Sequence, residues 1–166
     1  MPVSLIIIDA NVLIDIEKAE IVDLIFELDY EFAVPDLLYD EEIAPYSSDF
    51  NSSPLISMGF NEATSELLIK KQEQYKETAL SRYDISALVL AIQHECLLLT
   101  GERILRSTAA AAGIEVHGTL WLIEELFNNG LMTIEDIETA YEKMKEAGSH
   151  LPWGEVEKQI EKFKKK

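Results

Sequence analysis

The sequence predicts an α/β fold in which helices cover both faces of a central parallel sheet. Two observations support this prediction. Short apolar segments alternate with helical patterns along the chain, and the first apolar segment, Leu5 to Ile8, does not alternate with polar residues. An uninterrupted apolar run is typical of a strand buried on both faces. Strands that alternate with helices form parallel sheets through right-handed crossovers, so a three-layer α/β/α arrangement of about five strands is expected.

The expected elements follow one another in a regular order. Apolar residues at helical spacing join the first two strands, and a polar, turn-rich loop is expected over 46–54. Pro35 is placed to start a short helix, and Gly113 to stop an alanine-rich one. The expected strands are 5–8, 31–34, 55–58, 97–100 and 114–117, and the expected helices lie within 12–26, over 36–43, from 61, from 84 to about 95, over 104–112 and over 120–128.

The chain after Gly130 is polar and helical, which indicates an extension of the α/β core. Thr133 and Asp136 have the spacing of a capping box, with the shorter acid in place of the preferred Glu or Gln. Gly148 ends this helix, and Pro152 begins a last one that runs into the terminal lysines. We therefore expect an α/β domain over 1–130 and a helical extension over 131–166 that packs on it or trails from it.

Composition narrows the class of protein. A chain of 166 residues that is 48% apolar can bury a sizeable core, which excludes disorder. The 31 acidic and 14 basic residues give a net charge of -17. This charge argues against a broad basic face that coats nucleic acid, and it is compatible with a metal site built from carboxylates. Cys96, the single cysteine, is expected to be a small core residue, and no disulfide can form within the chain.

The sequence also bears on where the protein acts. No apolar run approaches the roughly 20 residues that span a bilayer, so no membrane association is expected. The first residues lack the basic stretch that opens a signal peptide. A cytoplasmic protein is the expectation.

Asp9 is the first candidate site residue. It directly follows the apolar run, at the carboxyl end of the first strand, and a carboxylate there is costly to bury without a partner. In open α/β sheets this edge is where ligands bind. The alternative is that Asp9 only caps the following helix, although Asn11 is an equally good cap and lies closer to the helical pattern.

Three further acids are placed to join Asp9. Glu41 follows the second strand, Asp84 lies where a polar loop meets an apolar helix, and Glu102 follows the fourth strand. If the first strand lies between the second and the fourth, all four carboxylates meet at one edge of the sheet. Like charges packed so closely cannot all ionise unless a cation neutralises them. Oxygen ligands without cysteine or a histidine pair favour Mg²⁺ or Mn²⁺.

Each of these positions has a structural alternative. Glu41 lies in an acidic run that is typical of a solvated helix face, Asp84 could be a helix cap, and Glu102 could favour a helix N-terminus. Asn11 and Thr100 are polar neighbours of the acids and could position water, a phosphate or a carboxylate. Their alternatives are a helix cap and a turn at the end of a strand.

The order of these motifs resembles the PIN-domain family. The matching residues are Ile8-Asp9-Ala10-Asn11-Val12-Leu13, Pro35 with Glu41 six positions later, Asp84-Ile85-Ser86-Ala87, and Leu98 to Arg106 followed by Gly113 and Gly118. The resemblance covers roughly residues 4–130. It implies a metal-dependent ribonuclease of the kind found as the toxin of toxin–antitoxin pairs. The implied catalytic and metal-binding residues are Asp9, Glu41, Asp84 and Glu102, supported by Asn11 and Thr100. The implied cofactor is Mg²⁺ or Mn²⁺, and the implied partners are RNA, an antitoxin protein and a second copy of the chain.

Two departures from the family pattern keep alternatives open. The family usually has aspartate where this chain has Glu102, and the strongly acidic composition argues against tight RNA binding. Both favour a catalytically weak PIN-like module that binds proteins. A phosphatase of the haloacid dehalogenase type also begins with an aspartate after a buried strand. That chemistry needs a second aspartate two positions later, where this chain has Asn11, which cannot transfer the proton.

Overall fold

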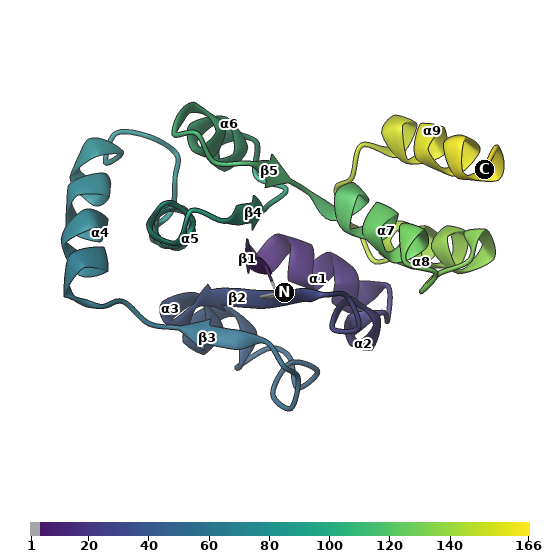
Figure 1. Cartoon of the computed structure of the whole chain (residues 1–166), viewed down its shortest axis with the longest axis horizontal. Helices are drawn as coiled ribbons and strands as arrows, with labels where there is room; N and C mark the ends of the chain where they lie inside the picture. The colour runs from purple at the N-terminus through teal and green to yellow at the C-terminus, as the bar shows by residue number, and fades with distance from the viewer. Residues whose placement is uncertain (1–3) are drawn as a thin grey trace.

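A single five-stranded parallel sheet organises the computed structural model, which describes residues 4–166. The strand order is β3-β2-β1-β4-β5, with β1 in the centre between β2 and β4 (Figure 1). The predicted α/β class is therefore confirmed, and the first strand does lie between the second and the fourth, as the proposed sharing of one edge requires. The strands are β1 (Ser4–Ile8), β2 (Tyr30–Pro35), β3 (Ile56–Met58), β4 (Leu97–Leu99) and β5 (Val116–His117).

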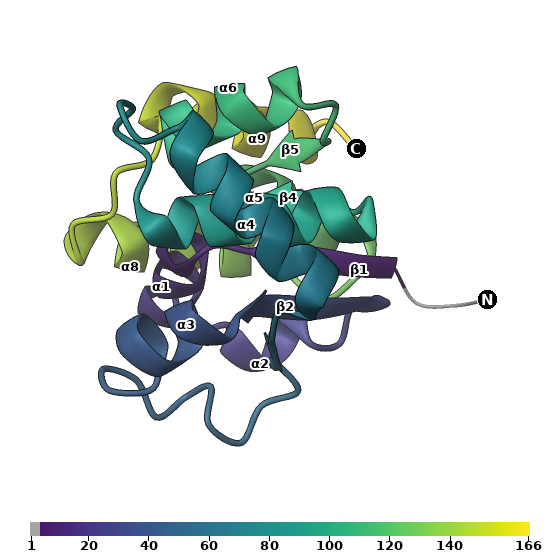
Figure 2. The ribbon, with the colours of Figure 1, turned by 90° about the vertical axis from the view of Figure 1, so that its left-hand side faces the viewer.

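Helices cover both faces of the sheet, and the side chains of β1 divide between them. Ile6 and Ile8 point into one core and Ile7 into the other, and all three are at most 1% exposed. This double burial explains why the first strand lacks polar alternation. The helices on the Ile6 and Ile8 face are α1 (Ala10–Lys18), α2 (Val22–Ile25), α7 (Thr119–Asn128), α8 (Ile134–Glu146) and α9 (Trp153–Lys164). On the Ile7 face lie α5 (Arg82–His94) and α6 (Arg103–Ala111), with α4 (Glu62–Gln74) packed on α5 (Figure 2).

Several helices differ from the sequence expectation for local reasons. The pattern over 12–26 divides into α1 and α2, because Glu20 adopts a left-handed backbone with φ of 61°. The expected helix over 36–43 divides into α3 (Asp36–Leu38) and a wider π-helical turn, η1 (Tyr39–Ile43). In this turn the Ala44 amide bonds the Tyr39 carbonyl, five residues back. Helix α5 begins at Arg82 rather than at Asp84, because Ser81 is its N-cap.

Two predicted features at the ends of elements have different outcomes. The capping box of α8 is confirmed, because Thr133 and Asp136 make both reciprocal bonds. Cys96, expected in the core, is only partly buried and packs against the edge of the core on the Ile7 face, where α5 turns into β4. That partial burial still raises the pKa of the Cys96 thiol to about 11.

The C-terminal helices share the core of the α1 face. Ile137 and Met144 of α8 and Phe163 of α9 are at most 1% exposed and belong to the same cluster as Ile8 and Ile16. Phe163 stacks on Phe127 of α7, with ring centroids 4.2 Å apart. Within residues 4–166, no helix has both the length and the apolar character needed to cross a membrane.

Candidate active site at the carboxyl edge of the sheet

Asp9 is a buried carboxylate held between the two central strands. It follows β1 and is 5% exposed. Its Oδ1 accepts a hydrogen bond from the Ala10 amide, and its Oδ2 accepts one from the Thr100 hydroxyl, each 2.9 Å long. Thr100 directly follows β4 and is fully buried, and its hydroxyl also accepts the Glu102 amide at 3.1 Å. Because β1 and β4 are neighbours, residues 91 positions apart in the chain form one polar unit.

Asp9 occupies the N-cap position of α1, but capping does not account for its burial. A capping side chain ordinarily accepts from the second or third helical amide, whereas Asp9 reaches only the first, that of Ala10. Asn11 is not the cap, contrary to the alternative drawn from the sequence. Its side-chain oxygen instead accepts the Gly101 amide at 3.3 Å, which ties α1 to the turn after β4.

The electrostatics of Asp9 show which acids lie near it. Burial raises the pKa of Asp9 from its ordinary 3.8 to about 6. The negative charges of Asp84 and Glu102 raise it further, while the hydrogen bonds from Thr100 and Ala10 oppose the change. Three of the four predicted acids therefore interact at one edge of the sheet. A carboxylate with a strongly perturbed pKa at a ligand-binding edge is a functional-site candidate.

Asp84 has a structural role as well as its place near Asp9. It is the third residue of α5 and forms a capping box with Ser81. The Asp84 amide donates to the Ser81 hydroxyl at 3.1 Å, and the Ser81 amide donates to Asp84 Oδ2 at 2.9 Å. The capping alternative is thus realised in part. It engages one carboxylate oxygen and fixes the orientation of the other.

Glu41 forms an ion pair with Arg82, a residue that the sequence analysis did not single out. Its Oε1 accepts from Arg82 Nη2 at 2.5 Å, which links η1 to the first turn of α5, two residues before Asp84. Its Oε2 is buried without a hydrogen-bond partner. Glu41 lies in the middle of the π-helical turn, a feature that is frequent at functional sites. No local pattern could reveal Arg82, because the pair is 41 residues apart.

Glu102 is the most exposed of the four acids. It holds the N-cap position of α6, yet its side chain makes no capping hydrogen bond. Its backbone is tied to the Asp9 unit through the Thr100 hydroxyl. The carboxylate itself therefore stays available to solvent or to a ligand.

The four acids fit a hydrated divalent ion better than a fully chelated one. Their donors are all oxygens, as Mg²⁺ and Mn²⁺ prefer. Over residues 4–166, no three His, Cys, Asp or Glu side chains lie close enough together to hold a metal ion directly. Mg²⁺ usually keeps several waters and binds one or two carboxylates. The buried, unpartnered Oε2 of Glu41 and the carboxylate of Asp9 are the groups that a cation would stabilise.

Comparison with family models identifies the class of protein. The family DUF3368, described as a PIN domain, matches residues 5–165. Because this match spans almost the whole chain, the protein belongs to the PIN-domain family DUF3368. PIN domains are a nuclease-type family that typically uses divalent metals, and the resemblance seen in the sequence motifs is confirmed. Comparison with curated proteins and with solved structures found no match.

Proposed function

We propose that this protein is an endoribonuclease that hydrolyses RNA with Mg²⁺ or Mn²⁺ at the carboxyl edge of the sheet. The observation that carries the proposal is the buried Asp9, whose raised pKa reflects burial and the charges of Asp84 and Glu102. Burying one carboxylate beside two others costs free energy in the metal-free protein. Such a cost at a ligand-binding edge is typical of a site that stabilises a cation.

The surroundings of each residue indicate its role in this reaction. Asp9, Asp84 and Glu102 would hold a hydrated ion, at least one of them through a bound water, and the free oxygen of Glu41 would complete the site or orient the attacking water. Thr100 fixes the Asp9 carboxylate, and Asn11 fixes the turn that carries Glu102. When bound, Mg²⁺ or Mn²⁺ supplies polarisation of the phosphodiester and a bound water of lower pKa.

The finer part of the proposal concerns the biological role. A toxin that acts in the cytoplasm, with an antitoxin protein and a second copy of the chain as partners, is what the family resemblance suggests. If this role is right, expression of the wild-type chain should arrest growth, and expression of Asp9→Asn should not. Growth arrest by both forms, or by neither, would contradict the toxin role.

Cleavage of single-stranded RNA is the direct test of the nuclease proposal. The purified protein should cleave with Mg²⁺ or Mn²⁺ and stop when EDTA is added. Asp9→Asn and Asp84→Asn should each lose most of the rate, because each removes a ligand charge from the metal. Lys70→Gln, a charge change on exposed α4, is the control and should keep the rate. Cleavage that survives EDTA or Asp9→Asn would contradict the proposal.

Metal binding can be measured without activity. A ligand that binds only the folded state stabilises it by about 2.7 kcal/mol at a hundredfold excess over Kd. For a domain of this size, roughly 2–4 °C per kcal/mol predicts a rise in Tm of about 5–10 °C. Millimolar Mg²⁺ or Mn²⁺ should produce this rise in the wild type and not in Asp9→Asn. Equal melting curves with and without metal would count against a metal site.

A catalytically weak protein-binding module remains the second candidate. The Arg82–Glu41 ion pair favours it, because the arginine already neutralises one of the four acids. On this view metal would give no cleavage of any RNA, and Arg82→Gln would not create it. On the nuclease view Arg82→Gln frees Glu41 and should tighten Mg²⁺ binding.

A further inference from the structure

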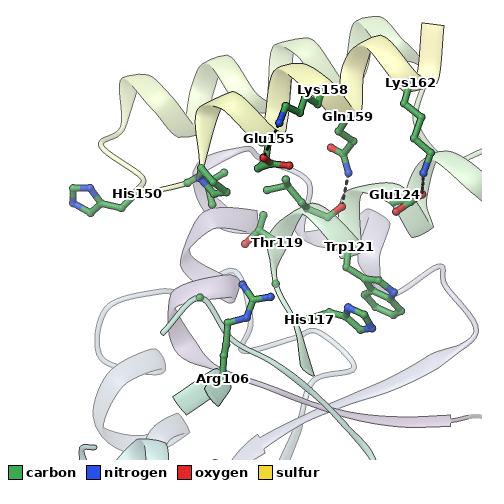
Figure 3. A pocket seen from close by; sticks show the side chains of 15 residues that line it. Arg106, His117, Thr119, Trp121, Glu124, His150, Glu155, Lys158, Gln159 and Lys162 are labelled. Carbon is green, nitrogen blue, oxygen red and sulfur yellow. Dashed lines mark hydrogen bonds and ion pairs between the residues drawn. The ribbon is translucent and has the colours of Figure 1, made fainter. Parts of the chain in front are cut away.

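A cavity with both charged and aromatic lining residues lies beside the acidic site. Its volume is about 600 Å³, and it opens between the β5–α7 connection and α9 (Figure 3). Arg106 of α6 reaches into it from one side, and Lys158 and Lys162 of α9 border it from the other (Figure 3). None of the four acids of the candidate active site lines this cavity.

The cavity borders the turn after β4, whose residues also belong to the acidic site. Gly101 lines the cavity, and its amide donates to Asn11. Its two chain neighbours are Thr100, which holds Asp9, and Glu102. On the other side of the turn, Gly118 packs so closely that an added Cβ would lie 3.4 Å from the Thr100 carbonyl oxygen. Thr100, which holds Asp9, is therefore the direct chain neighbour of a residue in the cavity wall.

Three cations and two acids line the cavity, namely Arg106, Lys158 and Lys162 with Glu124 and Glu155. Seven of the 14 basic residues lie in α6 or from 158 onward, and residues 103–114 include no acid. Arg106 makes no ion pair or side-chain hydrogen bond with any residue from 4 to 166. Lys158 and Lys162 pair with Glu155 and Glu124, yet their side chains remain 76% and 60% exposed. The guanidinium of Arg106 is thus available to bind an anion, and the two lysines can exchange their glutamate partners for one.

An aromatic pair forms another part of the cavity wall. The imidazole of His117 stacks on the indole of Trp121, with ring centroids 5.1 Å apart and an angle of 8° between planes. Tyr30 also contacts the same indole, with ring centroids 5.8 Å apart, and so restricts the position of Trp121. Aromatic side chains beside a cationic groove are the general means by which proteins bind single-stranded nucleic acid, because every base can stack.

We propose that this cavity binds one nucleotide of a single-stranded RNA, with a phosphate on Arg106 and the base against the His117–Trp121 pair. The inference rests on the proposed function, since it places the rest of the strand across Asp9. Single-stranded RNA is favoured over duplex, because a base paired in a duplex cannot offer its face to the stack. The cavity wall carries one more cation than acid, so its local charge is positive although the net charge of the chain is -17.

Binding is tested in the Asp9→Asn form, so that no cleavage interferes. Fluorescence anisotropy of a labelled single-stranded oligoribonucleotide should give an affinity about tenfold weaker for added Arg106→Gln. The slope of log K against log salt should fall by about 0.7, the value for one phosphate contact on a single strand. Lys70→Gln removes the same charge from exposed α4 and should change neither quantity. Glu155→Gln releases Lys158 and should tighten binding, which a purely structural role for the cavity would not produce.

The tryptophans provide a second measurement. Trp121 lines the cavity, whereas Trp153 packs on Tyr141 and is not part of the wall. With Trp153→Phe, the remaining indole fluorescence reports on the cavity alone. The single-stranded oligoribonucleotide should change it, a duplex of the same sequence should not, and Arg106→Gln should shift the change to higher RNA concentration.

The outcomes separate this inference from the proposed function. If the wild type cleaves RNA and Arg106→Gln binds it as well as Lys70→Gln does, the cavity inference is wrong and the nuclease proposal stands. If no cleavage occurs while binding depends on Arg106, the nuclease proposal is wrong and the cavity remains a nucleotide site. A poly-glutamate peptide that displaces the probe and binds more tightly than RNA would overturn the inference in favour of an acidic protein partner.

Discussion

At the scale of single residues, Asp9 lowers the stability of the folded protein at a position where the proposed function needs a carboxylate. It is buried, and its charge is opposed by Asp84 and Glu102, while two hydrogen bonds only partly compensate. One pKa unit is worth about 1.4 kcal/mol, so a change from 3.8 to about 6 corresponds to roughly 3 kcal/mol. A residue that destabilises the folded state to this extent is expected at a site where a bound ligand recovers the lost free energy.

The pH dependence of stability follows from the sign of this pKa change. The folded state binds more protons than the unfolded chain between pH 4 and 6, so stability should fall as pH rises through that range. In EDTA, Asp9→Asn should be more stable than the wild type at pH 7.5, by up to about 3 kcal/mol less any lost hydrogen bond. The difference should shrink toward pH 4, as denaturant unfolding at several pH values would measure.

Asp136 provides a control of opposite sign. Its hydrogen bonds to Thr133 lower its pKa, so its contribution is present at neutral pH and is lost as the pH falls. Asp136→Asn should therefore destabilise the protein at neutral pH and have less effect in acid. The same pH trend for Asp9→Asn and Asp136→Asn would contradict the account of Asp9.

Substitution of Glu102 tests whether a glutamate can bind the metal at a position where the family usually has aspartate. Its carboxylate has no capping bond to lose, so any effect of its substitution reports on the ligand role. Glu102→Gln should reduce metal-dependent cleavage nearly as much as Asp9→Asn does. Glu102→Asp should retain or increase it by restoring the usual length of the family. If Glu102→Gln cleaves at the wild-type rate, Glu102 is only the residue before α6 and has no part in the metal site.

At the scale of elements, the protein has two capping boxes of the same kind in different places. Ser81 with Asp84 begins α5 at the candidate site, and Thr133 with Asp136 begins α8, which packs on the opposite face of the sheet from α5. Loss of such a cap costs about 1 kcal/mol. Because the two boxes have the same chemistry, they separate the stability of a helix end from the function of the acid that it orients.

Substitution of the two caps should give equal losses of stability and unequal losses of activity. Ser81→Ala and Thr133→Ala should each lower the free energy of unfolding by about 1 kcal/mol. Only Ser81→Ala should slow cleavage, because it removes the hydroxyl that accepts the Asp84 amide and so loosens the first turn of α5, which positions the Asp84 carboxylate. Denaturant unfolding and RNA cleavage on the same preparations measure both effects. Equal activities for the two variants would mean that the orientation of Asp84 does not matter.

At the scale of the whole molecule, the C-terminal helices complete the core. Met132, Ile137, Met144, Val156 and Phe163 are all at most 4% exposed, and they pack with α1 and α7. Each fully buried side chain of this size contributes about 1.5–3 kcal/mol. Their sum is comparable with the 5–15 kcal/mol that keeps a domain folded.

Truncation tests whether residues 1–130 form an independent domain. We expect the chain that ends at 130 not to fold cooperatively, because it exposes the apolar faces of α1 and α7. Removal of 164–166 alone is the control and should change Tm by only a few degrees, since all three lysines are exposed. A sharp thermal transition of the 1–130 chain near that of the full chain would establish an independent domain.

Local chemistry was sufficient to predict the fold class and most of the elements. The apolar run of β1 predicted its burial on both faces, and the strand–helix alternation predicted the parallel sheet. Helix ends were less accurate, because a cap such as Ser81 depends on backbone geometry as much as on residue type. The π-helical turn at Glu41 has no sequence signal, since it depends on which carbonyl an amide reaches after packing.

By itself, the sequence determined the fold class, the family and four candidate acids at the ends of strands and helices. The tertiary structure alone decided their surroundings: the burial of Asp9, the bond from Thr100, the pairing of Glu41 with Arg82, and the cavity that begins at Gly101. The physical reason is distance along the chain. Hydrophobic patterns and caps act over a few residues, whereas desolvation, ion pairs and cavities arise between segments that only the crossovers of a parallel sheet bring together.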